Sequence, residues 1–308
     1  MSISVSIVVP VYNGQGTLEE LVRRITAAIA PGGSVFEIVL VNDGSRDGSW
    51  VRILDLCRKD ERVRGIDLMR NYGQHNAVLC GIRASRYDTI VTMDDDLQNP
   101  PEEIVNLLSE LEAGYDVAYG TPAAETHGLW RDLASRITKI ALQSTMGAET
   151  ARKVSAFRAF RTPIREAFGA YRSPFVSVDV LLTWGTSRFT SVTVQHNPRT
   201  VGTSNYTFRK LVTHALNMMT GFSTLPLQLA SLTGFAFTVF GVAILFYVVG
   251  RYLLQGTTVA GFPFLASVIA IFSGAQLFAL GVIGEYLARM HFRMMERPTY
   301  AIREQAGT

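Results

Sequence analysis

The sequence is poor in cysteine and in net charge, and each shortage excludes a class of protein. Its 308 residues contain two cysteines, Cys57 and Cys80, which lack metal-ligand spacing and rule out a disulfide-rich scaffold. We expect both to be buried free thiols. The net charge of +3 gives no broad cationic surface, so no nucleic-acid partner is expected. The first residues are too few and too polar for a signal peptide, and none is expected before the first strand.

Charge is also scarce, at 18% of residues against 48% hydrophobic, and the shortage is concentrated near the C-terminal end. The stretches 227–250 and 261–284 contain no charged side chain, and each is long enough to cross a hydrocarbon core. Buried helices of a globular protein are the alternative, but they are uncommon at this length. The pattern therefore predicts a transmembrane hairpin and a lipid bilayer as partner.

Basic residues flank this hairpin and predict its orientation. They are Arg209 and Lys210 before it, and Arg289, Arg293, Arg297 and Arg303 after it. Cytoplasmic flanks carry such an excess, so we expect a multi-pass protein of the cell membrane with both termini and the N-terminal domain in the cytoplasm. The expected organisation is a cytosolic domain (1–206), a juxtamembrane amphipathic helix (207–224), two spans (225–288) and a cytosolic tail (289–308). Self-association into a homo-oligomer is left open.

The first part of the chain alternates between β-branched runs and amphipathic stretches. Strands are expected at 6–11, 36–41, 63–68, 88–93 and 116–119, and helices at 18–29, 50–57, 76–83 and 101–111. Such alternation predicts an α/β fold of the Rossmann-like kind, with a mostly parallel sheet covered on both faces. Two more helical patterns, at 129–145 and 208–222, fit either core helices or basic amphipathic helices on a membrane surface.

Polar residues follow each of the first four expected strands: Tyr12-Asn13, Asn42-Asp43, Arg70-Asn71 and the acidic run 94–96. Each alone is ordinary turn chemistry, but ligands of open parallel sheets bind at the carboxyl ends of the strands. A nicotinamide site is excluded, because the glycine pair at 14 and 16 lacks the third glycine of the dinucleotide fingerprint.

The acidic run lies in the stretch TIVTMDDDLQNPPE at 89–102. If the chain stays extended there, Asp94, Asp96 and Gln98 share one face and Asp95 lies on the other. Three oxygen donors on one edge suit a hard divalent cation that also takes phosphate oxygens, and the cation offsets the repulsion between carboxylates. An acidic helix start is the alternative, but it accounts for the glutamates after the prolines and not for the aspartates before them.

The ordered set of motifs resembles the family 2 glycosyltransferases of the GT-A fold. The set is VVPVYN (8–13), VNDGSRDGS (41–49), RNYGQHNAVLCGI (70–82) and DDDLQNPPE (94–102). HNPRTVGTSNYTFRKL (196–211), FSTLPLQL (222–229) and GVIGEYLARM (281–290) extend the resemblance to the polyprenyl-phosphate glycosyltransferases. That group includes bacterial undecaprenyl-phosphate glucosyl- and aminoarabinosyltransferases and dolichol-phosphate mannose synthase. The resemblance implies a membrane-bound, inverting transfer of sugar from a nucleotide-diphosphate sugar, expected to be a UDP-sugar, to polyprenyl phosphate.

The resemblance also implies roles for single residues. Nucleotide-sugar contacts are expected from Pro10, Tyr12, Asn13, Asp43, Arg70 and Asp95, and a Mg²⁺ or Mn²⁺ ion on the diphosphate from Asp94, Asp96 and Gln98. Phosphate contacts to the lipid acceptor or the donor are expected from Arg131, Arg136, Arg158, Arg199 and Ser204. Of these, Asp94, Asp96, Arg131 and Arg199 are the expected catalytic residues.

Two departures from the family pattern leave alternatives open. Relatives often carry an acid where this chain has Gly14, and an aspartate where it has Ala156. A phosphate monoester has its second pKa near ~6, so the acceptor is already anionic at neutral pH and needs no general base. The departures also suit a non-catalytic membrane protein that binds nucleotide sugar or lipid phosphate. A polysaccharide synthase is a further alternative, although its Gln-x-x-Arg-Trp motif and additional spans are absent from the sequence.

Overall fold

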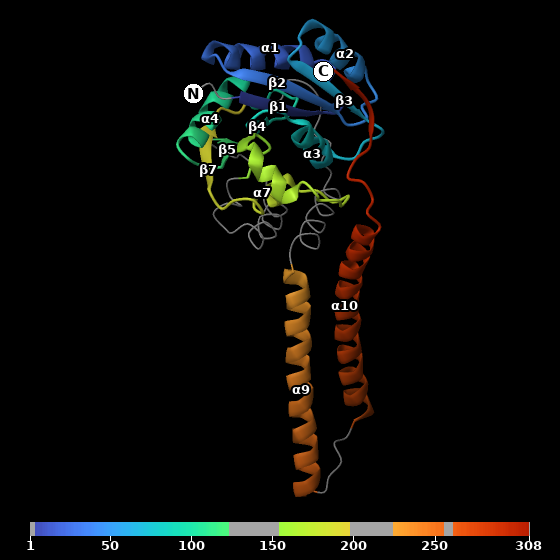
Figure 1. The fold of residues 1–308 in the computed structure, drawn as a ribbon. Helices are drawn as coiled ribbons and strands as arrows, with labels where there is room; N and C mark the ends of the chain where they lie inside the picture. The colour runs from blue at the N-terminus through green and yellow to red at the C-terminus, as the bar shows by residue number, and fades with distance from the viewer. Residues whose placement is uncertain (1–3, 123–153, 198–223, 256–260, 308) are drawn as a thin grey trace. The chain divides into compact units, whose positions relative to one another are not determined.

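The computed structural model describes residues 4–122, 154–197, 224–255 and 261–307 (Figure 1). The chain divides into two compact units. One comprises Met1–Ala215 together with Glu296–Thr308, and the other is the helical segment Leu216–Met295. The C-terminal segment thus returns to the unit in which the chain begins.

The first unit is built around a mixed sheet. Its strands in the described residues are β1 (Ser4–Val11), β2 (Val35–Asn42), β3 (Val63–Leu68), β4 (Thr89–Thr92), β5 (Val117–Pro122), β6 (Arg158–Arg161), β7 (Phe189–Val194) and β8 (Ile302–Ala306). They lie in the order β7-β5-β6-β4-β1-β2-β3-β8. The central strands β4, β1, β2 and β3 are parallel, while β6 and β8 run antiparallel to their neighbours. The predicted mostly parallel α/β sheet is confirmed.

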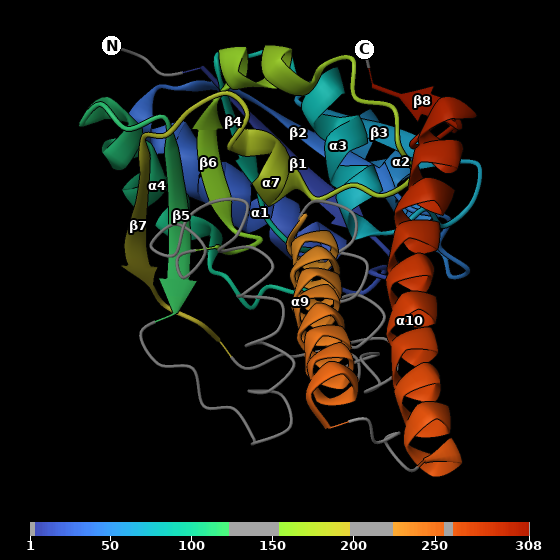
Figure 2. The ribbon, with the colours of Figure 1, turned by 90° about the horizontal axis from the view of Figure 1, so that it is seen from below.

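Helices cover both faces of this sheet (Figures 1 and 2). They are α1 (Leu18–Ile29), α2 (Ser49–Lys59), α3 (Gln74–Ala84), α4 (Ile104–Glu112) and α7 (Val178–Leu182), with short 3-10 turns η1 (Ala30–Gly32), η2 (Pro101–Glu103) and η3 (Thr162–Phe168). α1, α2 and α4 lie on one face, where Ile7, Leu21, Ile25 and Ile38 are fully buried in a common core. α3 and α7 lie on the other. The helices expected from apolar residues at helical spacing are confirmed as α1, α2, α3 and α4, whereas α7 was not predicted.

Three strands, β6, β7 and β8, were not predicted from the sequence. β6 is only four residues long and lies between β4 and β5 through non-local pairing. β8 comes from the segment 289–308, which was expected as a tail, and its sequence IREQA is polar because it lies at the edge of the sheet. The helical patterns at 129–145 and 208–222 fall outside the described residues.

The loops after β2 and β3 pack against each other through a glycine. Gly44 has a φ of +63°, in the left-handed region that favours glycine. A Cβ atom added at this residue would lie 2.5 Å from the backbone nitrogen of Asn71. The close approach of these two backbones fixes the position of the polar residues that follow both strands.

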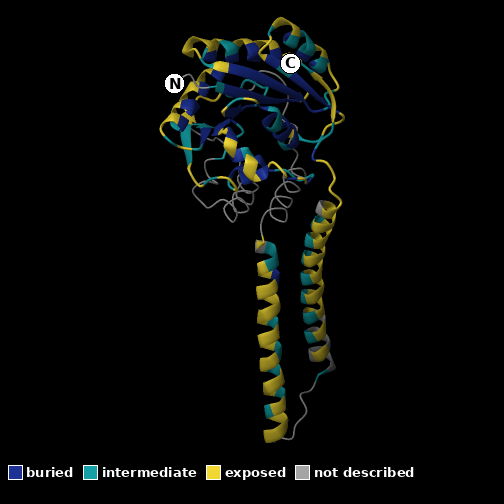
Figure 3. Cartoon of the chain, in the orientation of Figure 1, coloured by how far each residue is buried: buried dark blue, intermediate teal, exposed yellow. Residues whose placement is uncertain are grey.

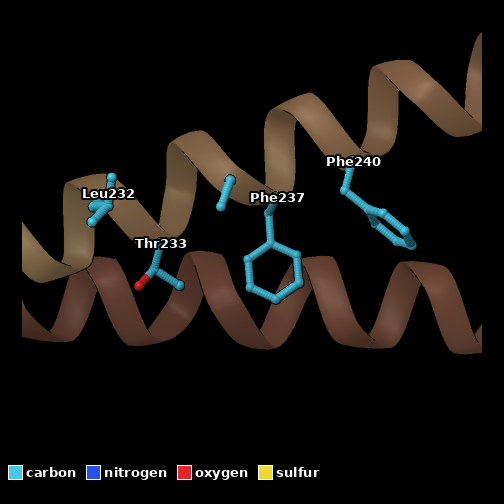
Figure 4. Close-up of a pocket in the computed structure, with 5 residues that line it drawn as sticks. Leu232, Thr233, Phe237 and Phe240 are labelled. Carbon is cyan, nitrogen blue, oxygen red and sulfur yellow. The ribbon is translucent and has the colours of Figure 1, made fainter.

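The second unit is a helical hairpin of α9 (Leu225–Gln255) and α10 (Phe262–Met294). The stretches Pro226–Leu254 and Ile271–Phe292 are long and apolar enough to cross a membrane. Phe237 of α9 meets Phe272 of α10 edge to face at 5.6 Å, and Figure 4 shows Phe237 directed toward the neighbouring helix beside Thr233. Large apolar residues are exposed along both helices, and Figure 3 colours the greater part of the hairpin as exposed, which is typical of helices that contact lipid.

Gly44→Ala is expected to destabilise the protein by about 2–4 kcal/mol, because the new methyl group meets backbone and the residue keeps a strained φ. Gly33→Ala is the matched control, since Gly33 has a φ of +66° but no heavy atom within 4 Å of its added Cβ. It should cost about 1 kcal/mol. Thermal unfolding of the purified protein in detergent compares the two, and equal melting temperatures would contradict the packing between these loops.

Candidate active site

The loop after β1 is tied to the loop after β2 by reciprocal hydrogen bonds. The backbone N–H of Asn13 donates to Oγ of Ser45 at 3.0 Å, and the N–H of Arg46 donates to Oδ1 of Asn13 at 2.8 Å. Asn13 adopts a φ of +55°, which asparagine tolerates better than most residues. Beside it, the ring of Tyr12 is 42% exposed at the carboxyl end of the sheet. An exposed aromatic ring on a fixed loop can stack against a planar ligand.

Asp43 is the buried anchor of this edge. Both its oxygens accept backbone hydrogen bonds, from the N–H of Tyr72 at 2.7 Å and the N–H of Gly73 at 2.9 Å. Burial raises the pKa of Asp43, and these two donors act against the rise. Only 3% of the residue is exposed, so its carboxylate holds the loop between β3 and α3 in place. Its expected contact with the nucleotide stays a prediction.

The acidic run does not continue β4, and the predicted alternation of its side chains is wrong. β4 ends at Thr92, a turn follows at Asp95-Asp96, and Leu97 has a φ of +59°. The physical reason is local: Oδ1 of Asp96 accepts the N–H of Gln98 at 3.1 Å, an aspartate turn that competes with an extended chain. The aspartates therefore lie in a turn beyond the end of β4 and not on an extended strand.

The carboxylates of Asp94 and Asp95 accept hydrogen bonds from different parts of the chain. Oδ1 of Asp94 accepts a hydrogen bond from the side chain of Gln74 at 2.6 Å. Oδ2 of Asp95 faces the backbone N–H of Tyr12 at 3.4 Å. Burial, followed by the neighbouring charge of Asp94, raises the pKa of Asp95 to about 7. The carboxylate of Asp95 is thus separated from Asp94 by its attachment to the loop after β1.

Gly14 makes the room that Asp95 occupies. A Cβ atom at Gly14 would lie 2.2 Å from Oδ2 of Asp95, a distance that no side chain can accept without displacing the carboxylate. The departure from the family pattern at this position therefore has a local consequence. An acidic side chain in place of Gly14 would conflict with Asp95 in both space and charge.

The donor types in the acidic loop fit a hard divalent cation. Asp94, Asp96 and Gln98 all offer oxygen, which Mg²⁺ and Mn²⁺ prefer. Burial is the main cause of the raised pKa of Asp95, and the charges of Asp94 and Asp96 add to it. Within the described residues, no three His, Cys, Asp or Glu side chains are arranged to enclose a metal ion by themselves. The chemistry of the loop therefore suits an ion shared with a substrate phosphate.

Arg158 is not available for a substrate phosphate, and that expectation is corrected. It is 2% exposed and forms an ion pair with Asp179, while its Nε donates to Oγ1 of Thr92 at 3.0 Å. The hydroxyl of Tyr119 also donates to Asp179, at 3.2 Å. A buried charge that already has its counter-charge holds neighbouring elements together. Here it links β4, β6 and α7 beneath the site.

The other expected residues divide between those at the edge of the sheet and those that the structure does not describe. Pro10 is buried near the end of β1, and Arg70 is exposed with its guanidinium 4.6 Å from the centre of the Tyr72 ring. Arg131, Arg136, Arg199 and Ser204 lie outside the described residues. Gln74 and Asp179 were missed, although Gln74 lies in the quoted motif RNYGQHN; nothing in the sequence singles out Asp179.

Comparison with known proteins agrees with this geometry. The model of the family described as "Glycosyl transferase family 2" matches residues 6–171. An undecaprenyl-phosphate 4-deoxy-4-formamido-L-arabinose transferase of Pseudomonas aeruginosa is 37% identical over 301 residues, covering 97% of this chain and 89% of the relative. A transferase of the same name from Salmonella paratyphi A is 34% identical over 303 residues, covering 97% and 93%.

A solved structure supports the fold. It is the glucosyl-3-phosphoglycerate synthase of Mycobacterium tuberculosis, crystallised with Mn²⁺, UDP-glucose and phosphoglyceric acid, with a TM-score of 0.52. The alignment covers 71% of this chain and 78% of the synthase at 18% identity, a level that shows the fold alone. The expected GT-A-like fold is confirmed. With the family match and a relative aligned along nearly its whole length, this chain belongs to glycosyl transferase family 2.

Proposed function

We propose that this protein is a membrane-bound inverting glycosyltransferase that moves a sugar from a UDP-sugar to polyprenyl phosphate. One observation carries the proposal: three carboxyl groups lie at the carboxyl edge of neighbouring parallel strands, and each is held by a hydrogen bond. They belong to Asp43, Asp94 and Asp95, and the donor to Asp94 is the side chain of Gln74. Open parallel sheets bind ligands at this edge. Relatives named for undecaprenyl phosphate and two apolar helices on the same chain support a lipid acceptor.

The donor would lie along the loops after β1, β2 and β4. Pro10, Tyr12, Asn13, Asp43 and Arg70 would surround the nucleotide. Its diphosphate would lie near Asp94, Asp96 and Gln98. A Mg²⁺ or Mn²⁺ ion on these oxygens would neutralise the diphosphate and make it a better leaving group.

The acceptor phosphate would meet arginines, whose planar forks pair with phosphate oxygens in a bidentate manner. Arg131 and Arg136 would contact the lipid phosphate, and Arg199 with Ser204 would bind a phosphate of donor or acceptor. The lipid phosphate would reach this site from the membrane, which the helical hairpin spans in our proposal.

The reaction needs no general base from the protein. The phosphate monoester is already ionised near neutral pH, since its second pKa is about 6. Its oxygen forms a bond to the anomeric carbon as the bond to the diphosphate breaks, and a single displacement inverts that centre. The absence of a carboxylate at Ala156, whose carbonyl accepts a hydrogen bond from Thr92, is compatible with this chemistry.

A transfer assay tests the proposed function. Membranes containing the protein are supplied with polyprenyl phosphate and a panel of radiolabelled nucleotide sugars, and lipid-linked sugar is extracted. Asp96→Asn should lower the rate at least about a hundredfold, because it weakens charge stabilisation at the diphosphate. Glu102→Gln is the matched control: Glu102 pairs with Arg24 on the surface, and its rate should stay within about twofold of wild type. Nucleotide or lipid binding without transfer would favour the non-catalytic alternative.

Gly14→Ala should lower the rate of transfer by about tenfold with little change in melting temperature, because the carboxylate of Asp95 must move away from its position beside Tyr12. Gly16→Ala is the matched control, since no heavy atom lies within 4 Å of its added Cβ. Steady-state kinetics of both variants would show the difference. A Gly14→Ala enzyme as active as the control would mean that the position of Asp95 does not matter.

The orientation of the hairpin can be tested by cysteine labelling. A cysteine at Thr257, in the loop between the helices, should react with an impermeant maleimide on intact cells, and one at Thr308 should react only after lysis. Burial raises the pKa of Cys57 to about 11 and that of Cys80 to about 12, so the native thiols should give little background. The opposite labelling pattern would contradict the proposed orientation, because it would place the active site on the side of the membrane away from cytosolic nucleotide sugars.

A further inference from the structure

The strand β8 carries a bulge that places Arg303 beside the donor edge of the sheet. β8 runs antiparallel to β3, with Glu304 opposite Asp67 and Ile302 opposite Leu68. One step along β3, from Asp67 to Leu68, thus corresponds to two steps along β8, and Arg303 is the extra residue. Bulges of this kind redirect a side chain.

Arg303 reaches a buried carboxylate of β3. Its Nη1 lies 3.2 Å from Oδ2 of Asp67, and its Nη2 donates to the carbonyl of Met69 at 2.8 Å. The side chain of Asp67 is only 3% exposed. Within the described residues, Arg303 is the cation paired with this carboxylate. A buried carboxylate that loses its counter-charge is costly to keep ionised.

The other oxygen of Asp67 holds the end of β2. Nδ2 of the buried Asn42 donates to Oδ1 of Asp67 at 2.7 Å. Oδ1 of Asn42 faces the N–H of Ser45 at 3.4 Å, and Oγ of Ser45 accepts the N–H of Asn13 at 3.0 Å. A continuous polar chain therefore leads from the C-terminal strand to the loops after β2 and β1.

We propose that Arg303 is a positioning residue for the donor loops, which makes the C-terminal strand part of the nucleotide-sugar site. By neutralising Asp67, Arg303 fixes the carboxylate that orients Asn42, and Asn42 orients the loop 43–46 beside Asp43. This proposal rests on the proposed function for the identity of the donor. An ordinary ion pair at the edge of the sheet is the competing explanation, since the side chain of Arg303 is 56% exposed and exposed pairs contribute little.

The test compares Arg303→Gln with Glu304→Gln in the full-length protein. Glu304 is the adjacent residue on the same strand, but its side chain accepts a hydrogen bond from Trp50 of α2 and, within the described residues, none from Asn42. With saturating polyprenyl phosphate, Arg303→Gln should raise KM for the nucleotide sugar about fivefold or more and leave kcat within about twofold. Glu304→Gln should change neither parameter by more than about twofold. Arg303→Lys, which retains the charge, should recover part of the loss.

A variant at Asp67 tests whether Arg303 acts on the donor site through this carboxylate. In the Asp67→Asn and Arg303→Gln double variant neither member of the pair is charged, so KM for the donor should return to within about twofold of the Asp67→Asn value. Equal effects of Arg303→Gln and Glu304→Gln, or an unchanged KM in a folded Arg303→Gln protein, would overturn the proposal. A loss confined to the lipid acceptor would overturn it as well.

Hydrogen exchange of the substrate-free protein separates this proposal from the proposed function. Peptides covering residues 42–49 should exchange about threefold or more faster in Arg303→Gln than in Glu304→Gln, because the polar chain to Asn42 is released. If wild type transfers no sugar but this difference in exchange is present, the proposed function fails while the positioning role stands. If transfer occurs and exchange in this loop is the same in both variants, the positioning role fails and the proposed function stands.

Discussion

The site depends on holding several carboxyl groups close together at one edge of a sheet. Each has its own donor: backbone N–H groups for Asp43, Asn42 for Asp67, Gln74 for Asp94, and the N–H of Tyr12 for Asp95. Burial and mutual repulsion disfavour carboxyl groups in such a place, and each hydrogen bond offsets part of that cost. The donors come from different elements, so satisfying the carboxylates also joins the loops of the site to one another.

This crowding gives the small residues Gly14 and Ala156 a local consequence. Gly14 leaves space for a carboxylate that arrives from the loop after β4, and an acid there would compete with Asp95. Ala156 removes a charge beside Thr92, in a protein whose proposed acceptor is already ionised. In this view both departures reduce negative charge at a crowded edge, and the chemistry loses nothing that it needs.

The two units of the chain are stabilised by different surroundings. The sheet and its helices bury apolar side chains such as Ile7 and Leu21 away from water, as globular domains do. The hairpin leaves large side chains such as Phe246 exposed over most of its length, which is favourable only in contact with an apolar surrounding. The strand β8 follows the hairpin in sequence and pairs with β3, so the chain enters and leaves the hairpin from the same unit.

The sequence by itself determined the central strands, the helices that pack on them, the hairpin and the motifs at the sheet edge. These features arise from local periodicity and from turn residues, which act over a few positions in the chain. The turn at Asp96 is local, but apolar periodicity does not reveal it. Only the tertiary structure decided that Arg158 pairs with Asp179 and that Arg303 reaches Asp67. Those contacts join residues that are distant in sequence. Periodicity predicts which face of a strand or helix is buried, but it carries no information about which partner a polar side chain finds.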